Sequence, residues 1–541
     1  MNSMHSVAIK PFAGQKPGTS GLRKKVREFQ QPGYLEAFVQ SLFDTQDNLK
    51  GGTLALGGDG RFFNREAVQI ILRLAAANGV AHVLLGQGGL LSTPAASAVI
   101  RAHGAQGGIV LSASHNPGGP QGDFGIKYNI SNGGPAPEAV TEAIFRRSQE
   151  IDRYLTIEAA DIDLDRLGET ILGGMRISII DPVADHAALL ETLFDFDAIR
   201  DLLRSGFRMR YDGMHAVTGP YARRVLVDML GAPESLLLNA VPLPDFGGGH
   251  PDPNPAHAEE LVGLMPGLDF GAASDGDGDR NMVLGPGIAV SPSDSLAVLA
   301  ANATLAPGYS QGIAGIARSM PTSRAADAVA KQLGIPCFET PTGWKFFGNL
   351  LDAGRITICG EESYGTSSNH VREKDGLWAV LFWLNLLAKR REPVAAILAQ
   401  HWRQYGRHYY SRHDYEAVET ATAQAAMADL AKALPGLVGQ AIDGMVITQA
   451  DDFAYTDPID GSIAKAQGLR VICGEQARVI ARLSGTGTEG ATVRLYFERF
   501  EADPARQQDD VQARLKPLID FAESKLGLRR RSGRAAPDVV T

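Results

Sequence analysis

A serine and a histidine stand together in a segment that reads LSASHNPGGPQGDFGIK, residues 111–127. A β-type run over residues 108–112 leads into Ser114 and His115, and the prolines and glycines that follow exclude a helix. A serine presented in such a loop can act as a nucleophile or carry a phosphoryl group, provided that its charge is neutralised nearby. An isolated Ser-His pair is more often an ordinary polar turn, so the rest of the chain must decide between the two.

A second segment, SDGDGDR at residues 274–280, alternates aspartates with glycines. Because glycine lets the backbone curl, Asp275, Asp277 and Asp279 can point at one centre, where a cation would relieve their mutual repulsion. Oxygen ligands suit Mg²⁺ or Ca²⁺, but Arg280 and Pro286 stand where an EF-hand needs glycine and glutamate. We therefore expect Mg²⁺, completed by a substrate or phosphoryl oxygen; the alternative is an acidic surface turn.

A third segment, RLSGTGTEG at residues 482–490, has the spacing GxGxxG. The alternating β-type run ATVRLYFERF follows it, and a dinucleotide-binding fingerprint requires a helix there, so we reject that interpretation. Hydroxyl side chains, free backbone N–H groups and flanking arginines instead predict a phosphate cradle, and the alternative is a glycine-rich hairpin turn. The cradle would contain Arg482, Ser484, Thr486, Thr488 and Arg494.

Weaker signals stand in two further loops. GEESYG, residues 360–365, offers Glu361 and Ser363 just past a predicted strand, and a carboxylate with a hydroxyl suits sugar hydroxyl groups. A helix N-cap is the commoner explanation of such a sequence. Thr342 and Gly343 either line a polar pocket or form a turn, and Arg23 is a plausible anion contact or a lone surface charge.

The elements that must position these residues alternate between short apolar strands and helices, which predicts parallel α/β sheets. The serine loop would then lie at the carboxyl end of a strand, where open α/β folds place their ligands. From about residue 405 the pattern changes to a polar, alanine-rich helix and two long β-like runs. We predict α/β domains over 1–190, 191–302 and 303–404, and a smaller α+β domain over 405–541.

Composition limits the classes of function. The chain has 541 residues and a net charge of −9, which argues against general nucleic-acid binding but not against an anionic small substrate. Its three cysteines form neither a disulfide framework nor a metal pattern. We see no signal peptide and no apolar stretch of the ~20 residues that span a bilayer. These features predict a cytoplasmic protein without a membrane partner.

Taken together, the segments describe phosphoryl transfer on a phosphorylated sugar, and the chain closely resembles the phosphoglucomutases of the α-D-phosphohexomutase superfamily. The resemblance covers essentially the whole chain and rests on KPGTSGLRKKV, SASHNPGGPQGDFGIKYNISNGGPAPE, DGMHAVTGPYA, FGGGHPDPN, DGDGDRNM, ARSMPTS, ETPTGWKFFGNL, GEESYGTSSNHVREKDGLWAV and RLSGTGTEGATVRLY. It implies an α/β architecture of three similar α/β domains plus a smaller α+β C-terminal domain around a central active-site cleft. Each domain would contribute one loop.

The resemblance also implies roles for individual residues. Ser114 would be the phosphoserine, and its phosphate would complete a Mg²⁺ site with Asp275, Asp277 and Asp279. Arg23 and Arg280 would steady the transferring phosphoryl group. The sugar would be bound by Thr342, Gly343, Glu361, Ser363 and Lys374, and its non-reacting phosphate by Arg482, Ser484, Gly485, Thr486 and Arg494. One departure is Ser112, where many relatives have threonine, which preserves the hydroxyl.

The implied reaction converts α-D-glucose 1-phosphate to glucose 6-phosphate through glucose 1,6-bisphosphate, which is both intermediate and activator. Lys127, His115 and His370 are the candidates for the base, and the resemblance favours Lys127. The expected partner is a small phosphosugar, and the expected state is a monomer or weak homo-oligomer. The alternatives are a mutase that prefers mannose or glucosamine phosphates, a metal-assisted phosphatase, and a non-catalytic phosphosugar-binding relative.

Overall fold

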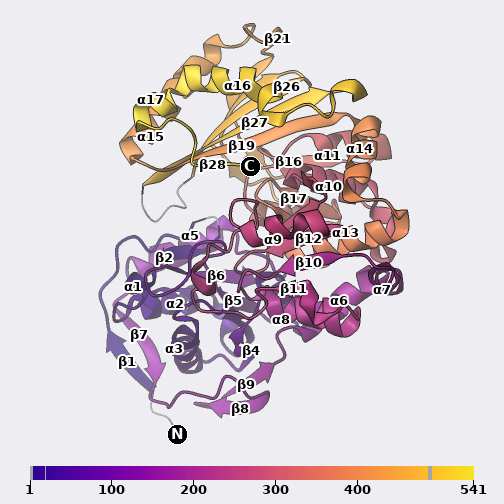
Figure 1. Ribbon diagram of the computed structural model, residues 1–541. Coiled ribbons are helices and arrows are strands. Elements are labelled where there is room, and N and C mark those ends of the chain that lie inside the picture. The colour runs from indigo at the N-terminus through magenta and orange to yellow at the C-terminus, as the bar shows by residue number, and fades with distance from the viewer. Residues whose placement is uncertain (1–3, 19, 485–489) are drawn as a thin grey trace. The chain divides into compact units, whose positions relative to one another are not determined.

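The structure is a computed structural model that describes all residues except 1–3, 19 and 485–489. The chain forms two compact units (Figure 1). Unit 1 comprises Met1–Ala289, Thr304–Gly312 and Tyr364–Arg391, and unit 2 comprises Val290–Ala303, Ile313–Ser363 and Glu392–Thr541. Because the chain passes between the units several times, each unit contains segments that are distant in sequence.

The first sheet of unit 1 has seven strands, and its central strands are parallel while its edges are antiparallel. The buried runs that predicted parallel strands form that centre. In order across the sheet the strands are β2 (Leu22–Lys25), β6 (Asp123–Ile130), β5 (Gly107–Leu111), β3 (Thr53–Gly58), β4 (His82–Leu90), β9 (Met175–Ile180) and β8 (Gly168–Leu172).

Helices of the first domain carry apolar faces against this sheet. On α3 (Asn64–Ala77) the buried residues include Ala67, Val68, Ile71 and Leu72, a spacing that places them on one side of the helix. The other helices here are α1 (Val26–Phe29), α2 (Tyr34–Thr45), α4 (Thr93–His103) and α5 (Glu138–Ser148), and a separate antiparallel pair joins β1 (Met4–Ala8) to β7 (Arg153–Ile157).

The second sheet of unit 1 has β11 (Leu237–Leu238), β10 (Met209–Asp212), β12 (Phe270–Ser274), β13 (Asn281–Gly285) and β14 (Ile288–Ala289), in that order. The first three strands are parallel to one another and the last three are antiparallel. Its helices are α6 (Ala184–Leu193), α7 (Phe196–Arg204), α8 (Thr218–Ala222) and α9 (Glu259–Leu264). The helix α8 continues directly as a π-helix over Arg223–Met229.

The long apolar run over residues 377–389, which lies within the α/β domain predicted over 303–404, forms the helix α13 (Gly376–Arg390), and this helix belongs to unit 1. It contacts β12, β13 and β18 (Gly365–Ser368). This helix is buried nearly all round, so its sequence showed that it was enclosed but not which sheet would enclose it.

Unit 2 contains two larger sheets, beside the short antiparallel pairs β20 (Ala441–Ile442) with β21 (Met445–Val446) and β23 (Tyr455–Thr456) with β24 (Ile463–Ala464). The parallel strands β16 (Cys337–Thr340), β15 (Ile316–Ser319) and β17 (Ile358–Glu361) lie side by side, with α10 (Pro292–Ala301), α11 (Ala325–Leu333), α12 (Lys345–Asp352) and α14 (Val394–Tyr405) around them. The antiparallel sheet has β22 (Gln449–Asp452), β25 (Leu469–Cys473), β26 (Ala477–Ser484), β27 (Ala491–Glu501), β19 (Arg407–Val418) and β28 (Val539–Val540). In Figure 1, α15 (Thr420–Ala433) and α16 (Val511–Leu526) cover one of its faces.

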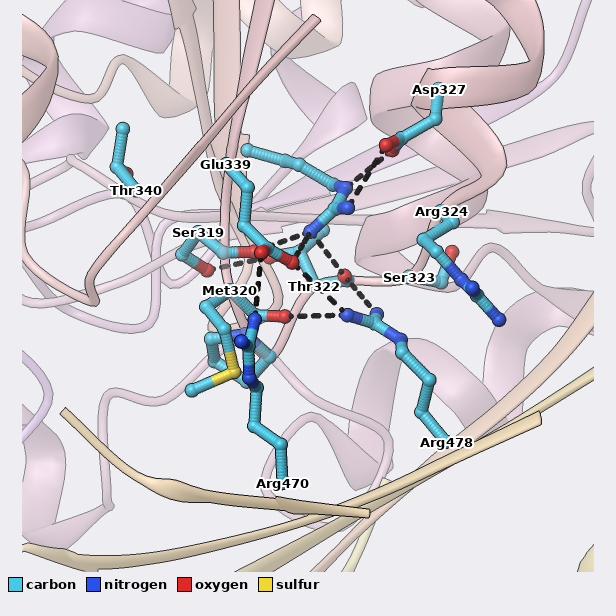
Figure 2. A network of polar contacts seen from close by, with 12 residues as sticks. Ser319, Met320, Thr322, Ser323, Arg324, Asp327, Glu339, Thr340, Arg470 and Arg478 are labelled. Atoms are coloured by element: carbon cyan, nitrogen blue, oxygen red, sulfur yellow. Dashed lines mark hydrogen bonds and ion pairs between the residues drawn. The ribbon is translucent and has the colours of Figure 1, made fainter. Parts of the chain in front are cut away.

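A network of buried arginines joins the two larger sheets of unit 2 (Figure 2). The carboxylate of Glu339 on β16 accepts hydrogen bonds of 2.9 Å from both Arg318 on β15 and Arg470 on β25. Arg478 on β26 donates to the backbone oxygens of Met320 at 3.0 Å and Thr322 at 2.8 Å. Charged groups from both sheets therefore satisfy one another inside the unit.

Among the helices that the structure describes, none combines the length and the apolar character needed to cross a membrane.

Candidate active site

Ser114 lies in a strained, buried turn that begins three residues after the end of β5. Its φ of 54° is in the left-handed region that is uncommon for serine, and only 1% of the residue is exposed. Its Oγ donates a 2.9 Å hydrogen bond to Asp275 Oδ2, and its backbone N–H donates to Ser112 Oγ at 2.7 Å. The structure thus brings the predicted serine and the first of the predicted metal aspartates into direct contact.

Two side chains that the sequence did not single out hold this turn. Arg61 donates to the backbone oxygen of Ser114 at 2.7 Å, and Ser112 donates to Asp59 at 2.6 Å. Asp59 and Arg61 form a 2.9 Å ion pair whose side chains are both fully buried. Burial raises the pKa of Asp59, and the positive charge of Arg61 opposes that rise. A signal existed in the sequence, because Asp59 and Gly60 directly follow the apolar strand β3, and residues past the carboxyl end of such a strand face the edge where α/β sheets bind ligands.

The three aspartates follow β12 and converge as predicted. All are at most 2% exposed, and one carboxylate oxygen from each lies within 4.8 Å of the others. A Cβ atom at Gly276 would come within 2.3 Å of the Ser114 backbone oxygen, so only glycine permits the two loops to approach.

The chemistry of this group fits a hard divalent cation. Oδ1 of Asp277 and Oδ1 of Asp279 are buried and accept no hydrogen bond within the described part of the chain. Such oxygens are costly to bury unless something binds them. Asp275 uses its Oδ1 to accept from the backbone N–H groups of Asp279 at 2.9 Å and Arg280 at 3.1 Å. Burial and the two neighbouring carboxylates raise the pKa of Asp275, which is the repulsion that a cation would remove.

Cationic and hydroxyl side chains surround the aspartates. Lys127 on β6 contacts Asp277 and lies 4.0 Å from Asp279, while Lys374 lies 3.2 Å from Asp279. Thr93 donates to Asp277 at 2.6 Å. Burial lowers the pKa of Lys127, but the charges of Asp277 and Asp279 outweigh it, so the net shift is upward.

The predicted arginines belong to the same group. Arg280 Nε lies 3.7 Å from Asp275 Oδ2 and 3.9 Å from Asp279 Oδ1. Arg23, on edge strand β2, has a lowered pKa because it is buried, although the nearby charge of Asp277 opposes the shift. Its Nε is buried and has no hydrogen-bond partner among the described residues, so one donor of this guanidinium is unused.

The candidate bases have different surroundings. His115 Nδ1 lies 3.5 Å from Ser114 Oγ, at the limit of a hydrogen bond. His370 is buried, and both of its ring nitrogens are engaged: Nδ1 with Ser368 Oγ at 2.8 Å and Nε2 with Asp375 Oδ2 at 2.9 Å. This arrangement favours a positioning role for His370.

Asp375 is the centre of that positioning network. Its Oδ2 also accepts from His186 Nε2 at 2.6 Å, and its Oδ1 accepts from the backbone N–H of Trp378 at 3.0 Å. It therefore caps the N-terminus of α13 while holding two histidines. Lys374, which contacts Asp279, is its neighbour in sequence, so the cap fixes the segment that carries this lysine.

The predicted sugar-binding residues divide between the two units. In unit 2, Glu361 at the end of β17 accepts a 2.7 Å hydrogen bond from the backbone N–H of Gly343, which joins the two predicted sugar loops. Thr342 has a buried Oγ1 without a hydrogen-bond partner in the described residues, and Ser363 is 9% exposed. Lys374 is in unit 1, beside Asp279.

The predicted phosphate cradle is described only in part, since Gly485, Thr486 and Thr488 lie outside the described residues. Arg482 and Arg494 are directly opposite each other on β26 and β27. Arg494 lies 3.5 Å from Asp414 on β19, and Arg412, two residues earlier on that strand, lies 3.1 Å from Asp414. Alternation along antiparallel strands puts these side chains on one face. Arg412 was missed because it stands far from the glycine-rich segment in sequence.

Comparisons with known families match consecutive parts of the chain. The phosphoglucomutase/phosphomannomutase alpha/beta/alpha domains I, II and III match residues 14–155, 185–287 and 292–405, and the C-terminal domain of phosphoglucomutase-1 matches residues 407–538. The chain belongs to the phosphoglucomutase family. The expected three α/β domains and separate C-terminal domain are thereby confirmed, whereas the predicted boundaries and the central cleft stay predictions.

Relatives of known activity cover the whole chain. The phosphoglucomutase of Rhizobium radiobacter is 58% identical over 539 residues, which are 99% of each chain. The cytoplasmic phosphoglucomutase of Populus tremula is 51% identical, again over 99% of both. The crystal structure of pp63/parafusin, a phosphoglucomutase from Paramecium, has a TM-score of 0.91 at 48% identity and covers 100% of this chain and 99% of its own. The activity is that of a phosphoglucomutase, as the sequence predicted, and the predicted membership of this family is confirmed.

Proposed function

We propose that this phosphoglucomutase carries the transferred phosphoryl group on Ser114 and works through glucose 1,6-bisphosphate. The observation that carries the proposal is the 2.9 Å hydrogen bond between Ser114 Oγ and Asp275, in a buried turn that Asp59 and Arg61 hold in a strained conformation. Backbone strain of this kind is typical of functional positions rather than of serines in ordinary turns. The three carboxylates beside this serine repel one another unless a cation binds them.

In the proposed reaction, phospho-Ser114 donates to the free hydroxyl of glucose 1-phosphate. The bond between Oγ and phosphorus breaks, a bond from the sugar oxygen to phosphorus forms, and the hydroxyl proton passes to Lys127 Nζ as the neutral amine, the form that a cation on the aspartates would favour. The bisphosphate then reorients and returns its other phosphoryl group to Ser114, leaving glucose 6-phosphate. Arg23 and Arg280 balance charge on the phosphoryl oxygens, and the chain mainly holds donor and acceptor in line.

Asp275, Asp277 and Asp279 would hold Mg²⁺, in line with the two unpartnered buried oxygens among the described atoms. Bound there, Mg²⁺ supplies positive charge to the phosphoryl oxygens and to the aspartates themselves.

Binding of the sugar falls to Thr342, Gly343, Glu361, Ser363 and Lys374 in this proposal. A buried carboxylate that accepts from a backbone N–H and a buried hydroxyl with no partner in the described chain together offer acceptors and a donor to vicinal hydroxyl groups. The face that carries Arg482, Arg494 and Arg412 supports the role of the cradle in holding the non-reacting phosphate, because guanidinium groups pair with phosphate oxygens.

The test compares Ser114→Ala with the wild type and with Ser41→Ala, a control that removes a buried hydroxyl which donates to the backbone oxygen of Ala37 in its own helix. We expect Ser114→Ala to lose conversion of glucose 1-phosphate to glucose 6-phosphate and to take up no labelled phosphoryl group from glucose 1,6-bisphosphate. Ser41→Ala should keep both. Full conversion by Ser114→Ala would refute the proposal.

The location and assembly of the protein are part of the same proposal. We expect a cytoplasmic enzyme that works as a monomer or weak homo-oligomer. The relatives from Populus tremula and Bromus inermis are named cytoplasmic, and that from Arabidopsis thaliana chloroplastic.

A further inference from the structure

Three metal-ligating side chains gather outside the aspartate group, in the segment of unit 1 that precedes α9. They are His250, Asp252 and His257, and one ligand atom from each lies within 4.8 Å of the other two. The rings of His250 and His257 have centroids 4.3 Å apart at an interplanar angle of 60°. None of the reaction steps above uses these groups.

A second observation concerns the ring of His250. Its Nδ1 is buried and has no hydrogen-bond partner in the part of the chain that the structure describes. Leaving a buried polar nitrogen without a partner is unfavourable, so such an atom calls for a ligand. His257 is exposed, which leaves the group open to ions from solvent.

The donor set distinguishes this group from the aspartates. Two imidazoles and one carboxylate suit zinc and the neighbouring transition metals, whereas three carboxylates suit Mg²⁺. We propose that His250, Asp252 and His257 form a second metal site, for a transition-metal ion of the Zn²⁺ class, which is separate from the aspartate site and lowers turnover when occupied.

The effect on turnover follows from two contacts. Asp252 Oδ1 lies 3.6 Å from Arg280 Nη1, so an ion bound to Asp252 competes for the carboxylate that faces this arginine. The ring of His250 packs edge-on against that of His115, with centroids 6.0 Å apart, and His115 is the neighbour of Ser114. The lowering of turnover rests on the proposed role of Arg280, whereas binding of the ion does not.

The binding test uses Cu²⁺ as the probe, on the tag-free chain in excess Mg²⁺ so that the aspartates are occupied. We expect one equivalent of Cu²⁺ to give an electron paramagnetic resonance spectrum with splitting from two nitrogens. His257→Gln and His250→Gln should each weaken Cu²⁺ binding by at least the roughly 10–100-fold that loss of an outer-shell partner costs at metal sites.

The matched control is His103→Gln, which removes a histidine that faces a single carboxylate, Asp185, at 2.8 Å. It should bind Cu²⁺ as the wild type does, and so should Ser114→Ala, which keeps failure of the proposed function distinct from failure of this site. Oxygen-only coordination, or unchanged affinity in both His257→Gln and His250→Gln, would overturn the metal site.

The effect on turnover is measured with Zn²⁺ at saturating Mg²⁺ and glucose 1-phosphate. We expect Zn²⁺ to inhibit the wild type and His103→Gln, and to inhibit His257→Gln only at concentrations at least tenfold higher, in proportion to its weaker binding. Equal inhibition of His257→Gln and the wild type would overturn the regulatory part of the proposal.

Discussion

Ser114 depends on residues that lie far from it in sequence. Its type and its loop left a nucleophile, a phosphoryl carrier and a polar turn open, and the resemblance to phosphoglucomutases favoured the carrier. The alternation of aspartate with glycine predicted the group of carboxylates that the serine contacts. Asp59 and Arg61 were not predicted, because an acidic turn after a strand has no pattern that reveals a buried ion pair. Their role becomes visible only when Arg61 is seen to donate to the Ser114 backbone.

Asp59→Asn tests this support at the scale of one residue. The amide keeps the shape of the side chain but leaves Arg61 as a buried charge without its partner. We expect the free energy of unfolding to fall by about 3–5 kcal/mol. We also expect kcat to fall up to ~100-fold with KM nearly constant, because a displacement of about 1 Å at the reacting atom has that effect. Asp165→Asn, which opens the exposed pair with Arg65, is the control and should change neither quantity appreciably.

The identity of the base is a second question at this scale. If Lys127 exchanges the proton, Lys127→Met lowers kcat by about 10²–10⁴-fold, and His370→Gln lowers it less, since both nitrogens of His370 are engaged elsewhere. The pH–rate profile should lose a limb in Lys127→Met and keep it in His370→Gln. The reverse order of the two variants would assign the base to His370.

At the scale of elements, the serine and the aspartates follow the carboxyl ends of β5 and β12. The alternation of strands and helices predicted this position for the serine loop, and the resemblance to phosphoglucomutases implied its meeting with the aspartates. Two features of the helices were not predicted: the π-helical geometry of Arg223–Met229 and the sheet that α13 packs against. Period and burial cannot distinguish an α-helix from the π-helix over Arg223–Met229, and the all-apolar face of α13 gives no direction toward one sheet. Tertiary packing decides both.

The cap of α13 permits a prediction at this scale. Asp375→Ala removes the acceptor of Trp378 N–H and of two histidines, so it combines the loss of a cap, worth about 0.5–2 kcal/mol, with the loss of buried hydrogen bonds. We expect a lower melting temperature and, because Lys374 is adjacent, a lower kcat. Asp510→Ala, which removes the cap of α16, should lower the melting temperature alone.

Unit 2 is held as a whole by charges that its sequence did not reveal as partners. Glu498 on β27 accepts from Arg478 at 2.6 Å, and both side chains are 2% exposed. Burial raises the pKa of Glu498, but Arg478 and a hydrogen bond from His408 outweigh it, and the net pKa lies well below the usual 4.5. Breaking such a buried pair costs about 3–5 kcal/mol.

Because the folded pKa is depressed, this stabilisation is present above pH 4.5 and is lost as the pH falls through the folded pKa. We expect Glu498→Gln to be less stable than the wild type at neutral pH, and the difference to shrink below pH 4.5. Urea unfolding of both proteins at several pH values measures it. Asp520→Asn, which opens an exposed pair with Lys516, serves as control, and a constant difference across pH would contradict the prediction.

The arginines around Glu339 also limit which domains can be exchanged between members of the family. Arg470 and Arg478 come from the C-terminal domain, while Glu339 and the backbone oxygens of Met320 and Thr322 come from the preceding one. A chimaera of two family members joined near residue 406, where the two family matches meet, would take the hydrogen-bond donors from one parent protein and the acceptors from the other. We therefore expect such a chimaera to fold only when the arginines and the groups that accept from them come from the same parent protein.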